Sequence, residues 1–73
     1  DLFQMLRERR KVLADEQNVP PYNVFADRTL REIASQRPKS IEAMRSIHGV
    51  GRVKLRNYGP TFLEVLGHGA ATR

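Results

Sequence analysis

The apolar residues of this chain recur at helical spacing, and no run alternates between apolar and polar positions in the way that strands require. Five apolar residues share one side of the first predicted helix: Leu2, Met5, Leu6, Val12 and Leu13. That helix should run from about Leu2 to Gln17, with Asn18 as its C-terminal cap. Pro20 and Pro21 prevent it from continuing, because proline lacks a backbone N–H and restricts the residue before it.

Polar caps and prolines divide the middle of the chain into two further helices. Asp27 is a good N-cap for a second helix over about Arg28–Gln36, and Pro38 prevents its continuation. Ser40 is placed to cap a short third helix. The apolar residues of this third helix lie about one turn apart: Ile41, Met44 and Ile47. Residues 19–26, between the first two helices, are expected to form an extended or single-turn connector.

Glycine and proline predict how the last part of the chain is divided. The turn Gly49-Val50-Gly51 breaks the third helix, and a fourth should run from about Arg52 to Gly59. Pro60 suits the first position of a fifth helix, which Gly67 and Gly69 would end. The sequence therefore predicts an all-α fold, a compact bundle of about five short helices with a helix-hairpin-helix-like Gly-Val-Gly turn.

Length and composition fit one helical domain without catalytic chemistry. The 73 residues allow one modest core, with residues 1–68 as the domain and residues 69–73 as a frayed tail. The absence of cysteine excludes disulfides and thiol nucleophiles. His48 and His68 stand far apart and in no metal-ligand pattern, and no glycine-rich phosphate loop is present. No apolar run is long enough to cross a membrane. We therefore expect no enzyme, no metal site and no membrane contact.

The net charge of +5 comes from the second half of the chain. Residues 1–36 carry six basic and six acidic side chains, which cancel, whereas residues 37–73 carry seven basic and two acidic ones, a balance of +5. A basic half-domain favours a polyanionic partner such as nucleic acid. A solvated, solubilising surface would carry the same charge, so charge alone does not separate the two interpretations.

The turn Gly49-Val50-Gly51, between an apolar helix and a basic one, resembles a helix-hairpin-helix motif. Gly49 supplies the backbone angles that reverse the chain, and Val50 plugs the core. Gly51 opens the next helix and leaves its first N–H groups facing outward. Such a helix end is suited to bind phosphate, and Arg52 and Lys54 add mobile cations beside it.

The same tripeptide could instead be only a compact connection between two helices. Leu55 favours that alternative, because phosphate-binding hairpins usually have a small residue four positions after the second glycine. A bulky side chain there is expected to space the helices apart and to misalign the amides.

Two aromatic residues have different expected places. Tyr22 follows two prolines on a stiff connector, where an exposed ring near Arg10 and Lys11 would offer a nucleic-acid base a stacking face. Alternatively, its ring packs on the first helix with the hydroxyl in water. Tyr58 lies in a helix with Val53 and Leu55 and is expected to be mostly core.

Several motifs together resemble the HRDC domain, the helicase-and-ribonuclease-D C-terminal module. They are VPPY-x-VF over residues 19–25, DRTLREIA over residues 27–34, Arg37-Pro38 and IHGVG over residues 47–51, followed by Lys54, Tyr58, Gly59 and Phe62. The resemblance runs from Leu2 to about Leu66 and is greatest to the version found in bacterial RecQ helicases.

The resemblance implies an auxiliary module of a RecQ-type DNA helicase, with a ribonuclease D as another possible parent. HRDC domains often bind single-stranded DNA weakly, through a basic surface and an aromatic residue whose position matches Tyr22. From the residues and the resemblance together, the predicted DNA-binding residues are Tyr22, Arg10, Lys11, Gly49, Gly51, Arg52 and Lys54. The alternative is a regulatory docking module that contacts the helicase core or a partner protein and has little affinity for DNA.

The same resemblance implies the setting in which the module works. Its partners would be single-stranded or branched DNA, or the parent's own helicase core, and it would act as a monomer. The domain itself needs no cofactor, while the parent helicase would use ATP and Mg. A bacterial, cytoplasmic and nucleoid-associated location is expected.

Overall fold

Four α-helices and one 3₁₀ turn follow one another in the computed structural model, which describes residues 1–71, with side chains for residues 1–67. In chain order these elements are α1 (Leu2–Gln17), η1 (Pro21–Asn23), α2 (Asp27–Gln36), α3 (Ile41–Arg45) and α4 (Arg52–Ala71). No strand occurs among the described residues, which confirms the predicted all-α class.

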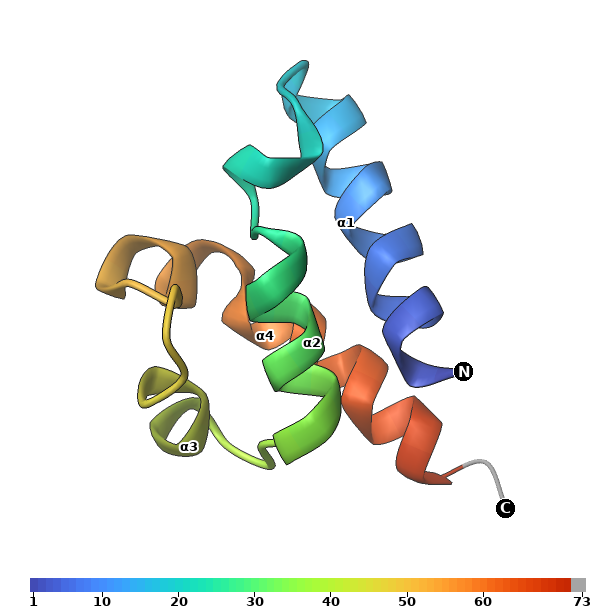
Figure 1. Cartoon of the computed structure of the whole chain (residues 1–73), viewed down its shortest axis with the longest axis vertical. Coiled ribbons are helices and arrows are strands. Elements are labelled where there is room, and N and C mark those ends of the chain that lie inside the picture. Colours follow the sequence, from blue (N-terminus) through green and yellow to red (C-terminus); the bar gives the residue numbers. More distant parts are fainter. Residues whose placement is uncertain (72–73) are drawn as a thin grey trace.

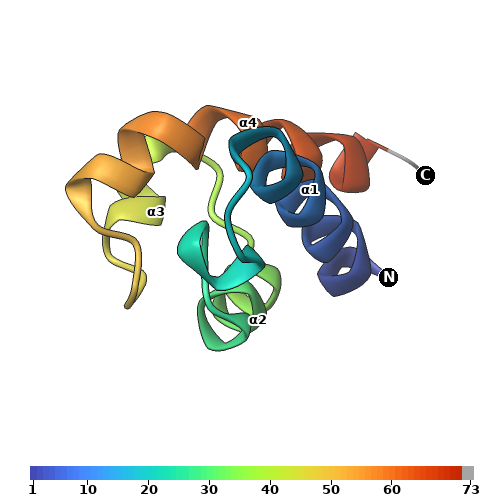
Figure 2. The same cartoon turned by 90° about the horizontal axis from the view of Figure 1, so that it is seen from above.

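Helix α4 passes behind α2 in Figure 1, and the view from above shows that it runs along one side of the molecule (Figure 2). Seen from above, α3 lies beneath the first half of α4, α1 lies beside the second half, and α2 lies on the opposite side (Figure 2). Helices α3 and α1 both pack on α4, while α2 and η1 pack on α1. The connector that carries η1 therefore spans from the end of α1 to the start of α2.

Both ends of α1 are capped by the residues next to it. The side chain of Asp1 accepts a hydrogen bond from the Gln4 N–H at 2.9 Å. At the other end, Asn18 adopts the left-handed conformation (φ 61°), and its N–H donates to the carbonyls of Ala14 and Asp15. These two caps fix α1 at Leu2–Gln17, which are the bounds that the sequence predicts.

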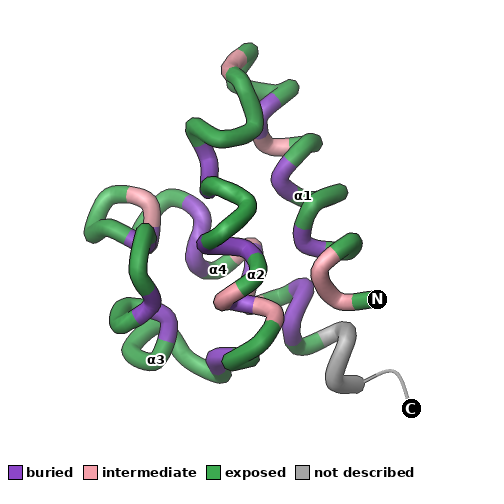
Figure 3. The backbone as a smooth tube through the Cα atoms, in the orientation of Figure 1, coloured by how far each residue is buried: buried purple, intermediate pink, exposed green. Residues whose placement is uncertain are grey.

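The core is built from apolar side chains of every α-helix and of the connector (Figure 3). The seven largest of the fully buried side chains are Phe25, Phe62, Leu6, Leu30, Ile33, Met44 and Val24. The Phe25 ring meets the ring of Phe62 edge-on at 5.2 Å and that of Tyr58 at 6.0 Å. The Tyr58 hydroxyl donates to the side chain of Gln17 at 2.9 Å, so this residue, predicted to be mostly core, also ties α4 to the end of α1.

Helix α4 continues without a break through Gly59 and Pro60, so the predicted fourth and fifth helices are one, and the expected count of about five helices is too high. The reason is an apolar stripe that keeps helical spacing across the proline: Leu55, Tyr58, Phe62, Val65 and Leu66. Burial of this stripe outweighs the hydrogen bond that Pro60 cannot donate. Gly59 also has a packing role, since a Cβ there would lie 3.0 Å from Ile41 Cδ1.

Three smaller boundaries also differ from the sequence expectations. Ala26, not Asp27, occupies the N-cap of α2, because the Asp27 side chain is turned toward Arg10. Helix α3 ends at Arg45, so Ile47 lies in the following turn, where it is buried.

At the C-terminal end, α4 continues past Gly67 to Ala71, rather than ending at the expected glycines. The last two residues of the predicted 69–73 tail lie outside the described residues.

Gly49 occupies a position that other residues fill only with strain. Its φ is +91°, and a Cβ built on it would collide with Oγ1 of Thr29 on α2. That hydroxyl donates to the carbonyl of His48 at 3.2 Å, while the side chain of Val50 is buried as expected. The turn is therefore attached to α2 at this glycine.

Gly51 provides a matched comparison, because a Cβ on it meets nothing within 4 Å. We expect Gly49→Ser to lower the free energy of unfolding by about 2 kcal/mol or more, through left-handed strain and the collision with Thr29. Gly51→Ser should leave stability nearly unchanged, since serine is a good N-cap. Urea unfolding followed by circular dichroism measures both, and equal stability of the two variants would contradict this account of the turn.

Candidate nucleic-acid interface

Tyr22 is exposed on a connector that is itself well fixed. Its side chain lies in η1, and 67% of the residue's surface is accessible. The 3₁₀ turn is closed by the N–H groups of Asn23 and Val24, which donate to the carbonyls of Pro20 and Pro21, both at 3.0 Å. Of the two places considered for this ring, the structure shows the exposed one, so the ring can serve as a stacking surface.

Arg10 is buried. The prediction that it is a surface cation beside Tyr22 is therefore wrong. It follows Leu6 and precedes Ala14 by one helical turn each, on the buried stripe of α1. Its Nη1 donates to the carbonyl of Phe25 at 2.8 Å, and its Nη2 pairs with the carboxylate of Asp27 at 2.8 Å. Arg10 is therefore a link between α1, the connector and α2, and it is not available as a DNA contact.

The ion pair with Arg10 changes the acidity of Asp27. The hydrogen bond from Arg10 and the positive charge of that side chain lower the pKa of the Asp27 carboxyl below its ordinary value, and Arg7 and Arg31 add to the shift. The side chain of Asp27 is mostly exposed, whereas that of Arg10 is buried. Water therefore reaches only the carboxylate end of the ion pair.

Lys11 is exposed on α1, and its place beside Tyr22 stays a prediction. Its ammonium group pairs with Asp15 one turn along α1, at 3.0 Å, and both side chains are largely in water. Such exposed pairs contribute little stability, so Lys11 can exchange this carboxylate for a phosphate at small cost.

The residues after the Gly-Val-Gly turn form the second predicted surface. The carbonyl of Gly51 accepts the first helical hydrogen bond, from the Leu55 N–H at 2.8 Å, so α4 begins directly after this glycine. The first N–H groups of an α-helix have no acceptor within the helix. Arg52 is exposed and Lys54 is half-buried beside them. Leu55 is buried in the core, and α3 and α4 still pack on each other despite its size.

The stretch of chain that contains this second surface carries an excess of positive charge. Between residues 37 and 56 there are six basic side chains and one acidic one, Glu42, a balance of +5. Five of the six are exposed: Arg37, Lys39, Arg45, Arg52 and Arg56. Both views draw η1 and the turn over residues 46–51 as separate segments, in teal and yellow (Figures 1 and 2). The structure thus has two candidate surfaces, one aromatic and one strongly basic.

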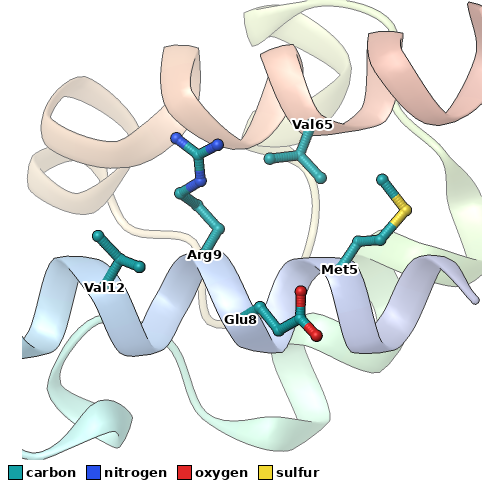
Figure 4. Close-up of a pocket in the computed structure, with 5 residues that line it drawn as sticks. All are labelled: Met5, Glu8, Arg9, Val12 and Val65. Carbon is teal, nitrogen blue, oxygen red and sulfur yellow. The ribbon is translucent and has the colours of Figure 1, made fainter.

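A shallow cavity of about 280 Å³ lies between α1 and α4, and no pattern in the sequence indicates it. Figure 4 shows Met5, Glu8, Arg9 and Val12 on α1, with Val65 of α4 pointing toward them. Met5 and Val12 were expected on the core-facing side of α1, but they are 39% and 50% exposed. They lie at the edge of the apolar side, where α4 does not fully cover them.

No group of metal-ligating side chains gathers among the residues whose side chains are described. His48 is exposed in the turn, and the side chain of His68 lies outside the described residues. No helix in the described part of the chain is both long and apolar enough to cross a membrane.

The model of the HRDC domain family matches residues 1–66. This chain belongs to the HRDC family. It is 47% identical over 66 residues to the ATP-dependent DNA helicase RecQ of Haemophilus influenzae, covering 90% of this chain and 11% of that protein. It is 45% identical over 64 residues to the Bacillus subtilis protein of the same name, covering 88% of this chain and 11% of that protein.

Similarity extends beyond RecQ proteins. The ATP-dependent DNA helicase UvrD2 of Mycobacterium tuberculosis is 41% identical over 66 residues, which cover 90% of this chain and 9% of that protein. Among solved structures, the third HRDC domain of RecQ from D. radiodurans superposes with a TM-score of 0.94 at 27% identity, covering 97% of this chain and 93% of that domain. This HRDC domain thus spans about a tenth of the curated relatives it matches.

We expect Arg10→Met to lower the free energy of unfolding by about 1–3 kcal/mol, because a buried carbonyl, that of Phe25, loses a donor from a charged group. Arg9→Met is the matched control one position earlier on α1, where the side chain is exposed, and it should change stability by less than about 0.5 kcal/mol. Thermal and urea unfolding measure both, and similar values for the two variants would show that Arg10 is not a structural link.

The lowered pKa of Asp27 predicts a specific acid sensitivity. A carboxyl whose pKa is lower in the folded state stabilises the fold fully above its unfolded pKa, and this stabilisation is lost as pH falls through the folded pKa. Below about pH 4, the wild-type domain should therefore lose stability more steeply than the Asp27→Asn variant. Urea midpoints measured from neutral to acidic pH test this. In an Arg10→Met background the effect of Asp27→Asn should shrink, and an unchanged effect would contradict the assignment.

Proposed function

We propose that this HRDC domain is an auxiliary module of a DNA helicase and adds weak, sequence-independent contacts with single-stranded or branched DNA. Its relatives are named as ATP-dependent DNA helicases, and the domain covers only about a tenth of them. We expect the remaining nine tenths of such a parent to supply ATP hydrolysis with Mg. The domain would act as a monomer, in a bacterial cytoplasm and near the nucleoid.

The observation that carries this proposal is the exposed ring of Tyr22 on a fixed platform. A tyrosine that is 67% exposed contributes little to folding, so its position calls for another explanation. The proline carbonyls close the 3₁₀ turn beneath it, and the buried side chains of Val24 and Phe25 anchor the residues that follow. A ring held in this way can stack on a base of any sequence with little further loss of freedom.

The charges support the same proposal. Exposed Lys11 lies on the helix that leads to the connector, and the region from Arg37 to Arg56 carries a balance of +5. Contacts of this kind attract phosphates without reading sequence, and their strength falls as salt is raised. We assign the base contact to Tyr22 and the phosphate contacts to Lys11, Arg52, Lys54 and the first amides of α4.

We expect Tyr22→Ala to weaken binding of a fluorescent oligo-dT by about 1–3 kcal/mol while the melting temperature stays the same, because the ring is exposed. Tyr22→Phe, which keeps the ring and removes the hydroxyl, should bind like the wild type. Fluorescence anisotropy at low and moderate salt measures the affinities. Absence of wild-type binding even at low salt would overturn the proposed function, and a large fall in melting temperature for Tyr22→Ala would show that the ring is part of the core.

A second candidate function, docking onto the parent's own helicase core, is favoured by the cavity between α1 and α4. Its partly exposed apolar residues, Met5 and Val12, lie beside one acidic and one basic side chain, a mixture found in protein interfaces. In this case the isolated helicase core would bind the domain at moderate salt. Val12→Asp would abolish that binding and leave oligo-dT affinity unchanged.

A further inference from the structure

The ring of Phe3 lies against two arginine side chains at the seam between α1 and α2. The guanidinium carbon of Arg31, on α2, is 4.7 Å from the ring centroid, and that of Arg7, one turn along α1, is 5.8 Å away. Phe3 is half-buried, whereas both arginines are exposed. The ring therefore holds two cations at the surface in a limited range of orientations.

The charge of this seam is not balanced by its neighbours. Three arginines, Arg7, Arg10 and Arg31, lie around one carboxylate, that of Asp27, which leaves a balance of +2. Arg10 already takes that carboxylate in a 2.8 Å ion pair. Among the described residues, neither Arg7 nor Arg31 forms an ion pair of its own, and the polar contact of Arg7 is with the amide oxygen of Gln4 at 3.3 Å.

The chemistry of an arginine on an aromatic ring suits a phosphate group. The ring covers one face of the planar guanidinium, while the N–H donors point outward in its plane. Those donors match two oxygens of a phosphate, so an arginine already held in place loses little freedom when it binds.

The seam leads directly to the connector that carries Tyr22. Along α1, the contact of Phe3 with Arg31 comes first, then the ion pair of Arg10 with Asp27, and then η1 at the far end. The rise from Phe3 to Arg10 is about 10 Å of helix. Figure 1 shows η1, in teal, at the end of the space between α1 and α2. The connector that carries Tyr22 thus lies at one end of the seam, and the contact of Phe3 with Arg31 lies toward the other.

We propose that Phe3, Arg7 and Arg31 form a phosphate-contacting surface that guides single-stranded DNA along the α1–α2 seam, away from Tyr22. This inference rests on the proposed function and adds a path for the strand. Single-stranded nucleic acid needs aromatic rings for bases and cations for its regularly spaced phosphates. The seam provides the cations, and the connector at its end provides the ring of Tyr22. An acidic peptide would bind the cations but would not stack on that ring.

The balanced charge of residues 1–36 does not oppose this path, because the charges are not mixed evenly in space. Arg7 and Arg31 lie on the α2 side of α1, whereas Glu8 lies toward α4, where it lines the cavity. A net charge of zero over this half therefore conceals a locally basic seam.

The test is the salt dependence of oligo-dT binding by the whole domain. Arg7→Gln combined with Arg31→Gln should weaken binding at low salt about tenfold or more, and should reduce the slope of log K against log salt by about 1.4, since each single-strand phosphate contact contributes about 0.7. The Lys substitutions at the same two positions should keep the slope.

Arg9→Gln, compared with Arg7→Gln alone, is the matched control on the α4 side of α1. Circular dichroism and melting temperature establish that each variant is folded.

Different failures of this test have different meanings. If the wild type binds and Tyr22→Ala weakens binding, but the Arg7 and Arg31 variants keep the wild-type slope, the seam path is wrong and the proposed function stands. If the wild type does not bind oligo-dT at low salt, the proposed function itself fails. If a poly-glutamate peptide binds more tightly than oligo-dT and depends on Arg7 and Arg31, the seam is a protein contact and the inference is overturned.

Discussion

The guanidinium of Arg10 is the interaction on which the arrangement of the first half depends. It adds a polar link between three segments that also pack on one another: α1, on which it lies, the connector through the Phe25 carbonyl, and the start of α2 through Asp27. Because Phe25 is also the ring that meets Phe62 and Tyr58, its backbone must be held where its side chain can reach α4. A charged group inside a small domain is costly unless it is paired, and here the pair also sets the direction in which the connector leaves the core.

The second half is held by contacts of another kind. A glycine in the left-handed region brings the turn onto Thr29, and a second glycine within α4 lets Ile41 of α3 approach closely. In this half, side chains of neighbouring helices approach the backbone closely at the two glycines. The outcome is that both candidate DNA-binding segments, η1 and the turn before α4, stand on parts of the chain that the core holds in place.

The sequence was informative where local chemistry decides the structure. Asp1 and Asn18 end α1 by their own hydrogen bonds, so its bounds could be predicted from the residues alone. Pro60 was misleading because local preference opposed a buried stripe that continues from Tyr58 to Phe62, and the stripe prevailed. That spacing was present in the sequence and was the signal to follow.

The candidate site was less predictable, because it depends on which side chains the fold brings together. Two prolines before Tyr22 suggested an exposed ring but could not exclude its packing on α1. Arg10 resembled any other cation of a basic helix until tertiary packing placed it on the buried stripe. The approach of Arg31 to Phe3 joins residues from two helices, and no pattern within either helix indicates it.

The exposure of Tyr22 above a buried Val24 and Phe25 has a consequence for how such a domain can change over time. The side chains that would meet a ligand are not the ones that keep the chain folded. Substitutions at Tyr22, Lys11 or Arg31 can therefore accumulate without passing through an unstable intermediate. The same scaffold matches proteins named as RecQ and as UvrD2 helicases, and its surface can differ between them without loss of the fold.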